Sequence, residues 1–198
     1  MVGTTRAPGV PGRDETMRAV VIYESMYGNT HVVADHIAEG LRSRFDVDVV
    51  PVGGATAELL AHCDLVVCGG PTHVHGMSSE RSRAAAVTAQ EKEPARLSLD
   101  PEAAGPGLRD WFQTIPPGGH TPAAAFDTRI DGPAPLTGRA SRGIARRLRD
   151  HDFRLVVGPE SFLVDKQTRL VAGEEERATA WGASVAAAAA AAEHPVRP

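Results

Sequence analysis

The sequence predicts an α/β protein with a doubly wound, five-stranded parallel sheet and helices on both faces. Short apolar runs alternate along the chain with longer segments of helical periodicity, and the runs at 18–23 and 64–70 are apolar almost throughout. Such strands are typical of parallel sheets, which are buried on both faces. Parallel neighbours also need crossover connections, and the intervening helices supply them. At 198 residues the chain has room for one well-buried domain.

Five segments are expected to form the strands. The second of them, 46–52, contains Pro51, and it is expected at an edge of the sheet because proline cannot donate a ladder hydrogen bond. The expected strands are 18–23, 46–52, 64–70, 120–126 and 153–157.

The helices follow from apolar residues at helical spacing. In the first, Val33, Ile37 and Leu41 form one stripe. A later helix is expected to begin at Thr137, whose hydroxyl suits an N-cap. The expected helices cover 30–44, 55–61, 137–149 and 173–192.

Two segments depart from this alternation. Residues 1–16 hold Gly and Pro without periodicity, so we expect a disordered extension before a single domain over 17–194. Residues 76–106 are expected to be an insertion, with a helix at roughly 78–90 followed by a proline-bearing loop. A loop of this length inside a compact domain is usually a lid or a partner surface.

Composition and charge exclude several classes of protein. A net charge of −4 argues against a nucleic-acid binder that works by neutralising phosphates. No apolar stretch approaches the roughly 20 residues that span a bilayer, so no membrane association is expected. Cys63 and Cys68 match no zinc or CxxC spacing and suit buried, reduced thiols. A cytoplasmic location is therefore expected.

The turn after the first strand carries the main functional signal. It contains neither the GxxxxGK[ST] loop of nucleotide-binding proteins nor a GxGxxG fingerprint. Backbone amides at the start of the following helix carry the positive end of its dipole, and hydroxyl and amide side chains add donors, so the turn can cradle an anion. Alternatively, Asn29 or Thr30 merely caps the helix. The candidate residues are Ser25, Met26, Tyr27, Gly28, Asn29 and Thr30.

This turn, SMYGNT, resembles the phosphate-binding loop of the flavodoxin family, which usually reads [ST]-x-[ST]-G-x-[ST] after the first strand. Ser25, Gly28 and Thr30 match the pattern, whereas Tyr27 replaces the middle hydroxyl residue. The form SMYGNT is similar to the variant in flavodoxin modules of multidomain oxygen-reducing flavoproteins. The resemblance implies the strand order 2-1-3-4-5 and FMN as the cofactor.

Two further loops lie at the carboxyl ends of strands, where doubly wound sheets bind ligands. By the resemblance, the loops after the third and fourth strands contact the isoalloxazine ring. Their candidate residues are Pro71, Thr72, His73, Val74, His75 and Gly76 after the third strand, and Phe126, Asp127, Thr128 and Arg129 after the fourth.

Several of these side chains have alternative roles. His73 and His75 lack a nearby Asp, Glu or Cys in their loop, so no metal site is expected. One of them donates a hydrogen bond to the flavin, or both are solvated. If Asp127 points toward the ring, its negative charge disfavours the anionic reduced flavin. If Arg129 points toward the ring, its positive charge favours that form. The other possibility is a surface ion pair between these two residues.

One basic stripe is expected on the helix at 137–149. It is either a solvated face or a docking surface for an acidic partner or the phosphate of NADPH. Its members are Arg139, Arg142, Arg146 and Arg149.

Three functions remain open. The first is a single-domain FMN redox protein that transfers electrons between partner proteins. This is the leading hypothesis. Carriers of this family often stack aromatic rings on the flavin and have a strongly acidic rim, whereas the chain has only nine aromatic residues and a modest negative charge. This difference leaves room for a second function, an NAD(P)H-dependent FMN reductase acting on quinones or nitro compounds. In that case the 76–106 insertion forms a wall over the flavin. The third is a flavin-free interaction module, supported by Tyr27. No hydrolytic triad is indicated, and no catalytic residue is assigned.

Overall fold

The computed structural model describes residues 16–73, 75–92 and 98–193. The expected disordered extension at 1–16 lies outside these ranges except for its last residue, and Val74 lies outside them as well.

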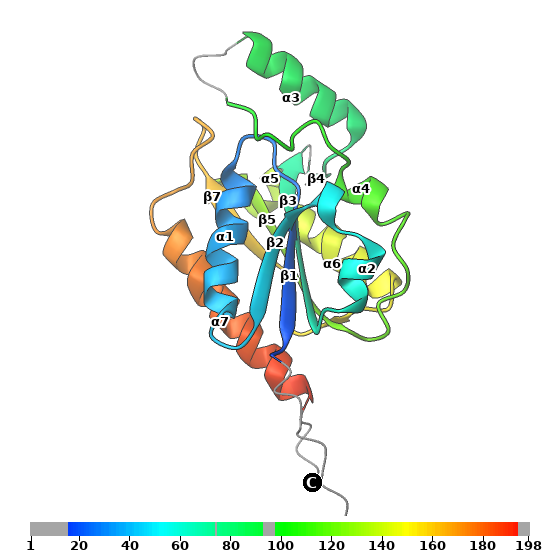
Figure 1. The fold of residues 1–198 in the computed structure, drawn as a ribbon. Helices are drawn as coiled ribbons and strands as arrows, with labels where there is room; N and C mark the ends of the chain where they lie inside the picture. The colour runs from blue at the N-terminus through cyan, green and yellow to red at the C-terminus, as the bar shows by residue number, and fades with distance from the viewer. Residues whose placement is uncertain (1–15, 74, 93–97, 194–198) are drawn as a thin grey trace, which may run out of the picture.

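The described part of the chain forms one sheet with helices on both faces, which confirms the predicted fold class (Figure 1). The strands are β1 (Arg18–Tyr23), β2 (Asp46–Pro51), β3 (Leu65–His73), β4 (Gly76–Met77), β5 (Pro122–Ile130), β6 (Arg154–Leu155) and β7 (Glu160–Val164). Their order is β2-β1-β3-β5-β6, with parallel pairing throughout this path. The short β4 pairs antiparallel with the end of β3.

The fifth position of the sheet is shared by two short strands. The single strand expected at 153–157 is wrong in extent, because β6 covers only two of those residues. β6 pairs with the start of β5 and β7 with its end. Gly158 and Pro159 lie between them, and proline supplies no amide for a ladder. If the short β4 is left out and β6 and β7 are counted together as one strand, the strand order is the predicted 2-1-3-4-5.

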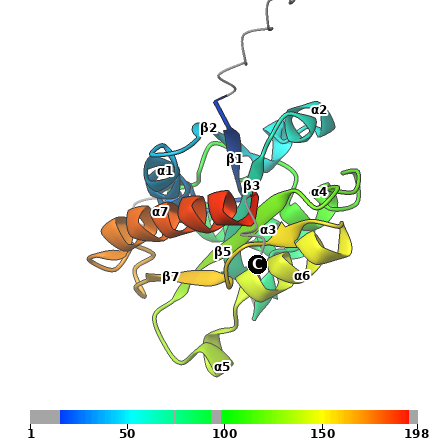
Figure 2. The same cartoon turned by 90° about the horizontal axis from the view of Figure 1, so that it is seen from below.

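Two helices cover one face of the sheet and three cover the other (Figure 2). The first pair is α1 (Asn29–Leu41) and α7 (Glu174–Glu193); the other three are α2 (Ala57–Ala61), α4 (Leu108–Trp111) and α6 (Ala140–Asp150). A 3₁₀ turn, η1 (Val52–Gly54), follows β2. The helices expected at 30–44, 55–61 and 173–192 are thus confirmed within a few residues.

Helices α1 and α7 approach each other closely. A Cβ added at Gly182 would lie 2.2 Å from the carbonyl oxygen of Ile37, and one at Gly40 would lie 2.1 Å from the carbonyl oxygen of Thr179. Both glycines are therefore required by packing. The contact fixes α1 against the sheet, and with it the turn that precedes α1.

The helix expected at 137–149 begins later than predicted. Thr137 ends a separate short helix, α5 (Ala134–Thr137), and so is not the N-cap of α6. The amide of Ala140 donates to Oγ1 of Thr72 (2.9 Å), and the amide of Ser141 donates to Oδ2 of Asp127 (2.7 Å). Residues of β3 and β5 thus cap α6, and sequence proximity does not reveal such caps.

The insertion contains α3 (Glu80–Lys92), two residues later than the expected helix at 78–90. Figure 1 shows α3 above the end of the sheet where β1, β3 and β5 finish. Residues 93–97 lie outside the described ranges. In the part of the chain that the structure describes, no helix is long and apolar enough to cross a membrane.

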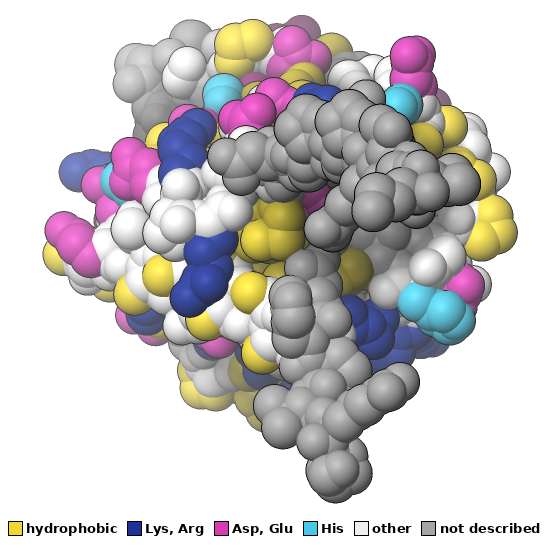
Figure 3. Space-filling view, turned by 60° about the horizontal axis from the view of Figure 1, so that its bottom comes forward, with side chains coloured by type: hydrophobic (Ala, Val, Ile, Leu, Met, Phe, Trp, Pro, Cys, Tyr) yellow, Lys and Arg dark blue, Asp and Glu magenta, His cyan; other side chains and the backbone are white. Residues whose placement is uncertain are grey.

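The opposite end of the molecule carries a mixed surface. Figure 3 shows that acidic and basic side chains are interspersed over the uncovered part of this lower face. The candidate site lies at the other end, beneath α3.

Candidate functional site

The turn before α1 exposes backbone donors. Gly28 directly precedes the helix with φ +84°, a left-handed conformation that favours glycine, and a Cβ there would meet no atom within 4 Å. Its amide donates to Oγ of the buried Ser25 (3.1 Å). The amides of Asn29, Thr30 and His31 belong to the first helical turn, so the helix offers them no carbonyl. These donors and the helix dipole create a positive potential suited to an anion.

Two side-chain hydrogen bonds join this turn to other loops. Oγ1 of Thr30 and Oγ1 of Thr128, at the end of β5, lie 2.8 Å apart. Nδ2 of Asn29 donates to the carbonyl of Thr168 (3.0 Å), in the loop after β7. The Thr30 and Asn29 side chains therefore position the turn, and the first-turn amides supply donors that have no partner within the helix.

A cavity of about 200 Å³ opens beside the turn. Nine of the residues predicted from the sequence line it: Met26, Tyr27, Asn29, Thr30, Pro71, Thr72, His73, Thr128 and Arg129. Five others that line it were not predicted: Ile130, Val164, Asp165, Lys166 and Thr168. The ends of β1, β3, β5 and β7 thus meet at one cavity.

Phe126 and Asp127 lie away from this cavity. Phe126 is fully buried and packs edge-on against Phe162 and Trp181 on the α7 face of the sheet. Asp127 is also fully buried and accepts hydrogen bonds from the Thr72 hydroxyl (3.1 Å) and the Ser141 amide. Burial raises the pKa of this carboxyl, although these hydrogen bonds oppose the shift.

Arg129 is oriented by its own loop. Its Nη1 donates to the carbonyl of Gly132 (2.8 Å), to Oγ1 of Thr137 (3.0 Å) and to the carbonyl of Ile130 (3.2 Å). Asp127 and Arg129 thus have separate partners and do not form the surface pair considered above. Arg129 nevertheless lines the cavity.

The two histidines after β3 occupy different places. His73 lines the cavity, and burial lowers its pKa, with the nearby charge of Glu24 acting in the opposite direction. His75, with φ +69°, forms a backbone bridge with Gly138. Gly138 also has a positive φ, and a Cβ there would lie 2.2 Å from Cα of His75. This contact holds the loops after β3 and β5 together.

A second depression, of about 500 Å³, adjoins His75. Arg139 and Arg142 line it. Arg142, Arg146 and Arg149 of the predicted basic stripe are exposed. Arg139 instead donates to Oγ of Ser161 (3.0 Å) and to the Pro159 carbonyl (3.2 Å), so it holds the loop before β7.

The tyrosine that departs from the loop pattern has a structural role. The Tyr27 hydroxyl donates to the carbonyl of Ala86 in α3 (3.3 Å), and burial raises its pKa. Met26 is buried against Ala86 and Ala103 of the insertion. The insertion therefore rests directly on the turn that carries the anion-binding amides.

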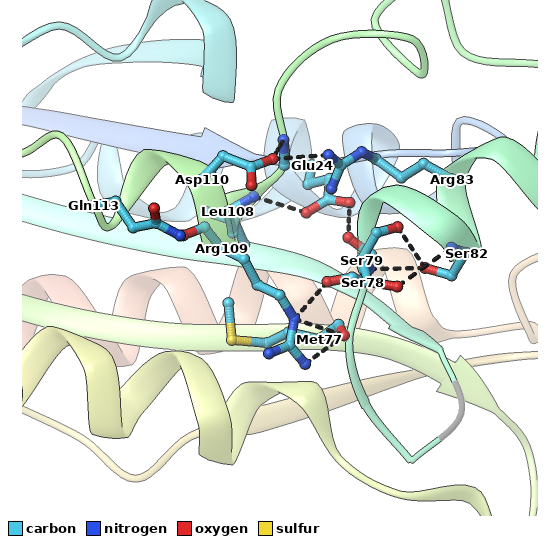
Figure 4. Close-up of polar contacts among 11 residues, drawn as sticks. Glu24, Met77, Ser78, Ser79, Ser82, Arg83, Leu108, Arg109, Asp110 and Gln113 are labelled. Atoms are coloured by element: carbon cyan, nitrogen blue, oxygen red, sulfur yellow. Dashed lines mark hydrogen bonds and ion pairs between the residues drawn. The ribbon is translucent and has the colours of Figure 1, made fainter.

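A buried carboxylate fastens both ends of the insertion to this turn (Figure 4). Glu24, the first residue after β1, is 6% exposed. Its Oε1 accepts a hydrogen bond from Oγ of Ser78, just before α3, and its Oε2 accepts from the amide of Leu108 (2.9 Å), at the start of α4. Close by, Arg83 of α3 pairs with Asp110 (2.7 Å). One carboxylate thus couples the turn to the insertion.

A larger cavity of about 670 Å³ lies between α3 and the turn. Tyr27 and His73 line both this space and the 200 Å³ cavity, so the two adjoin. The remaining lining residues come from α3 and the residue before it: Ser79, Arg81, Ser82, Ala85, Ala86 and Ala89.

Comparison with known proteins gives a partial family match. Residues 21–105, which are less than half of the chain, match the model of the flavodoxin family. The fold of the chain is flavodoxin-like. No curated protein gives a significant match.

Several solved structures share the fold at low sequence identity. A flavodoxin from the domain Archaea is 19% identical, with a TM-score of 0.58, covering 88% of this chain and 99% of its own. Flavodoxin 2 from Bacillus cereus is 22% identical, with a TM-score of 0.56, covering 87% and 97%. The Flv1 flavodiiron core from Synechocystis sp. PCC6803 is 17% identical, with a TM-score of 0.57, covering 91% of this chain and 38% of that chain.

Proteins of the flavodoxin family bind FMN. The residues of the present chain fit such a group. The unpaired first-turn amides suit a phosphate, Gly28 leaves open space above them, and threonine side chains line the adjoining cavity.

The sequence did not indicate the contribution of the loop after β7. The run Glu160–Val164 is short and follows a Gly-Pro pair, so it was not recognised as a strand. Recognising it would have placed residues 165–168 at the carboxyl edge of the sheet, where ligands bind.

Proposed function

We propose that this flavodoxin-like protein binds FMN at the turn before α1 and transfers electrons between partner proteins. The observation that carries the proposal is the set of backbone donors around Gly28, which opens onto a cavity formed by the ends of four strands. When bound, FMN supplies one- and two-electron redox chemistry. The amides of the first helical turn bind the phosphate, and the loops after β3 and β5 orient the ring.

Several properties of the residues support this assignment. The site combines a positive helix terminus with the hydroxyl pair of Thr30 and Thr128, of which one hydroxyl hydrogen is left to donate to a phosphate or a polyol chain. His73 is held largely uncharged at neutral pH because burial lowers its pKa. Its ring is therefore available as a neutral hydrogen-bond partner at the edge of the site. We also place the protein in the cytoplasm, because Cys63 and Cys68 are buried free thiols.

A second candidate function is an NAD(P)H-dependent FMN reductase that acts on quinones or nitro compounds. The 670 Å³ cavity between α3 and the turn favours it, because its size suits a small molecule and it adjoins the proposed flavin site. A pure carrier needs no such space.

The test begins with the absorption spectrum of the purified protein after incubation with FMN. NADPH and NADH are then added without oxygen. Bleaching only after a separate reductase is supplied supports the carrier, whereas bleaching by pyridine nucleotide alone supports the reductase. Protein that takes up no FMN overturns both and leaves the flavin-free interaction module.

A pair of matched variants tests the site itself. Gly28 precedes α1 with φ +84°, Gly173 precedes α7 with φ +88°, and a Cβ at either meets no atom within 4 Å. Gly28→Ala and Gly173→Ala should each destabilise the protein by about 1–2 kcal/mol. Only Gly28→Ala should weaken FMN binding, by about 10-fold or more. If the two variants changed the affinity for FMN equally, the turn before α1 would not be part of the FMN site.

A further inference from the structure

The segment that connects β5 to α6 exposes apolar side chains at the rim of the candidate site. Leu136 of α5 is 71% exposed and Ile130, at the end of β5, is 52% exposed. In the described part of the chain they are the two most exposed large hydrophobic side chains. Ile130 also lines the 200 Å³ cavity, and Figure 2 shows α5 projecting from the rest of the molecule. Isolated exposed apolar side chains are common, so the charges beside these two decide what they signify.

A positively charged face of α6 adjoins this segment. Arg142, Arg146 and Arg149 follow one another at helical spacing, so they share one face, and all three are exposed. Within the described residues, none of the three forms an ion pair with a carboxylate. Asp150, the last residue of α6, is the acidic residue of this helix. The whole chain has a net charge of −4, so this face is a local excess of positive charge on an acidic protein.

The depression of about 500 Å³ joins the apolar and the basic parts of this surface. Pro135 of α5 and Arg142 of α6 both line it. Gly138, another lining residue, forms a backbone bridge to the loop after β3. Nη1 of Arg129 donates to Oγ1 of Thr137 (3.0 Å) and so fixes the end of α5. Because these contacts hold the surface in shape, a partner would bind it with little loss of conformational entropy.

We propose that this surface is a docking surface for a partner protein that presents carboxylates around an apolar side chain. The docking surface consists of α5, the 500 Å³ depression and the arginine face of α6. Leu136 and Ile130 supply the apolar contacts, and the guanidinium groups of α6 pair with the carboxylates and steer the approach of the partner. Arginine and apolar side chains together are typical of protein–protein interfaces.

The identification of this partner as a redox partner rests on the proposed function. A protein seated on Ile130 reaches the rim of the cavity that we assign to the flavin. The inference adds the chemistry of the partner: its contacting surface is acidic. The docking surface itself rests on the residues of α5 and α6 and needs no bound flavin.

A protein partner fits this surface better than a nucleic acid does. Binding to a phosphate backbone depends on positive charge along the whole contact. Here the exposed Asp131 follows Ile130, and the exposed Asp150 ends α6, so carboxylates lie at both ends of the docking surface. The 71% exposed side chain of Leu136 also has no role in binding phosphates.

The experiment titrates a peptide with blocked termini and the sequence Glu-Glu-Leu-Glu-Glu into isotope-labelled protein without flavin. The peptide Lys-Lys-Leu-Lys-Lys is its counterpart of opposite charge, and a short DNA duplex represents a nucleic acid. NMR chemical shifts at low and high salt give the location of binding, the dissociation constant and a check that each variant is folded. We expect the glutamate peptide to shift amides of α5 and α6 and to bind at least about 5-fold more weakly at high salt.

Variants of matched charge locate the effect. Arg142→Gln/Arg146→Gln should weaken binding of the glutamate peptide about 3- to 10-fold. Arg42→Gln/Arg44→Gln changes the net charge equally at two exposed arginines that follow α1; it should change the dissociation constant less than about 2-fold. Leu136→Ser should weaken binding about 3-fold or more and leave its salt dependence unchanged, because it removes only apolar contact.

The outcomes separate this inference from the proposed function. Wild-type protein that binds FMN but not the glutamate peptide overturns this inference alone. Equal weakening by the two double variants also overturns it, because it indicates a response to net charge only. Binding of the lysine peptide as tightly as the glutamate peptide contradicts an acidic partner, and tighter binding of DNA contradicts a protein partner. Protein that binds the glutamate peptide at α5 and α6 but takes up no FMN supports the docking surface and overturns the proposed function.

Discussion

Glu24 is the residue whose removal should most clearly uncouple the insertion from the flavin site. Its carboxylate is 6% exposed and accepts hydrogen bonds from the Ser78 hydroxyl and the Leu108 amide. Hydrogen bonds to a charged acceptor contribute about 1.5–3 kcal/mol each. Glu24→Ala would also leave both donors without this partner in the interior. We therefore expect it to lower the free energy of unfolding by about 3–5 kcal/mol.

An isosteric variant and a surface variant make the measurement specific. Glu24→Gln keeps the shape and one accepting oxygen, so it should cost about half as much. Glu39→Ala removes a carboxylate whose side chain is 55% exposed and lies near His36; it should cost less than about 1 kcal/mol. Urea unfolding followed by tryptophan fluorescence gives these values. The buried Trp111 is a suitable probe because it lies in α4, the short helix that begins at Leu108.

The coupling can also be followed in the native state. If Glu24 fastens the insertion, Glu24→Ala should make α3 more accessible to limited proteolysis before the rest of the domain unfolds. It should weaken FMN binding as well, since the turn before α1 begins at this residue. A Glu24→Ala protein within 1 kcal/mol of wild type, with α3 as resistant to protease as before, would refute the role assigned to this carboxylate.

Three further predictions follow from packing and from pKa shifts. Gly182→Ala should destabilise the protein by about 2–4 kcal/mol in urea unfolding, because the new Cβ would lie 2.2 Å from a backbone oxygen of α1; a near-neutral effect would contradict the close contact of α1 and α7. Burial raises the pKa of Cys63 to about 11 and also raises that of Cys68, so a thiol reagent at neutral pH should label both only after unfolding. Labelling of the native protein at the rate of the unfolded chain would contradict this. Because burial lowers the pKa of His73 in the folded state, the unfolded state binds the proton more readily, and stability should fall as pH drops below about 6.5. His73→Gln should reduce this dependence of the free energy of unfolding on pH. If the dependence were the same in both proteins, groups other than His73 would cause it.

Much of the fold was predictable because local patterns and tertiary structure agree. β1 and β3 are continuous apolar runs, and their burial on both faces explains that composition. The apolar stripe of α1 likewise identified the face that packs on the sheet. The order of strands followed from the family resemblance and not from the pattern alone.

The errors occur where distant residues determine the local structure. Thr137 suited an N-cap by type, but Thr72 and Asp127 supply the partners for the first amides of α6. The strand β7 was missed because Gly158 and Pro159 separate it from β6. Phe126 was placed near the ring by its position after a strand, whereas the sheet continues through it and buries its side chain on the α7 face.

Tyr27 shows how one residue can be interpreted correctly only in the structure. As a departure from the loop pattern, it supported the alternative of a flavin-free interaction module. Its hydroxyl contacts α3, and its neighbour Met26 is buried under the insertion. Tyr27 thus contacts the insertion, and the backbone donors around Gly28 remain in place.

The most direct test of the account is a crystal structure of the protein with FMN. We expect the phosphate at the first turn of α1, with the amides of Asn29 and Thr30 at about 3 Å from its oxygens and the ring beside His73. A flavin bound elsewhere on the protein, with another group occupying the turn around Gly28, would contradict the account.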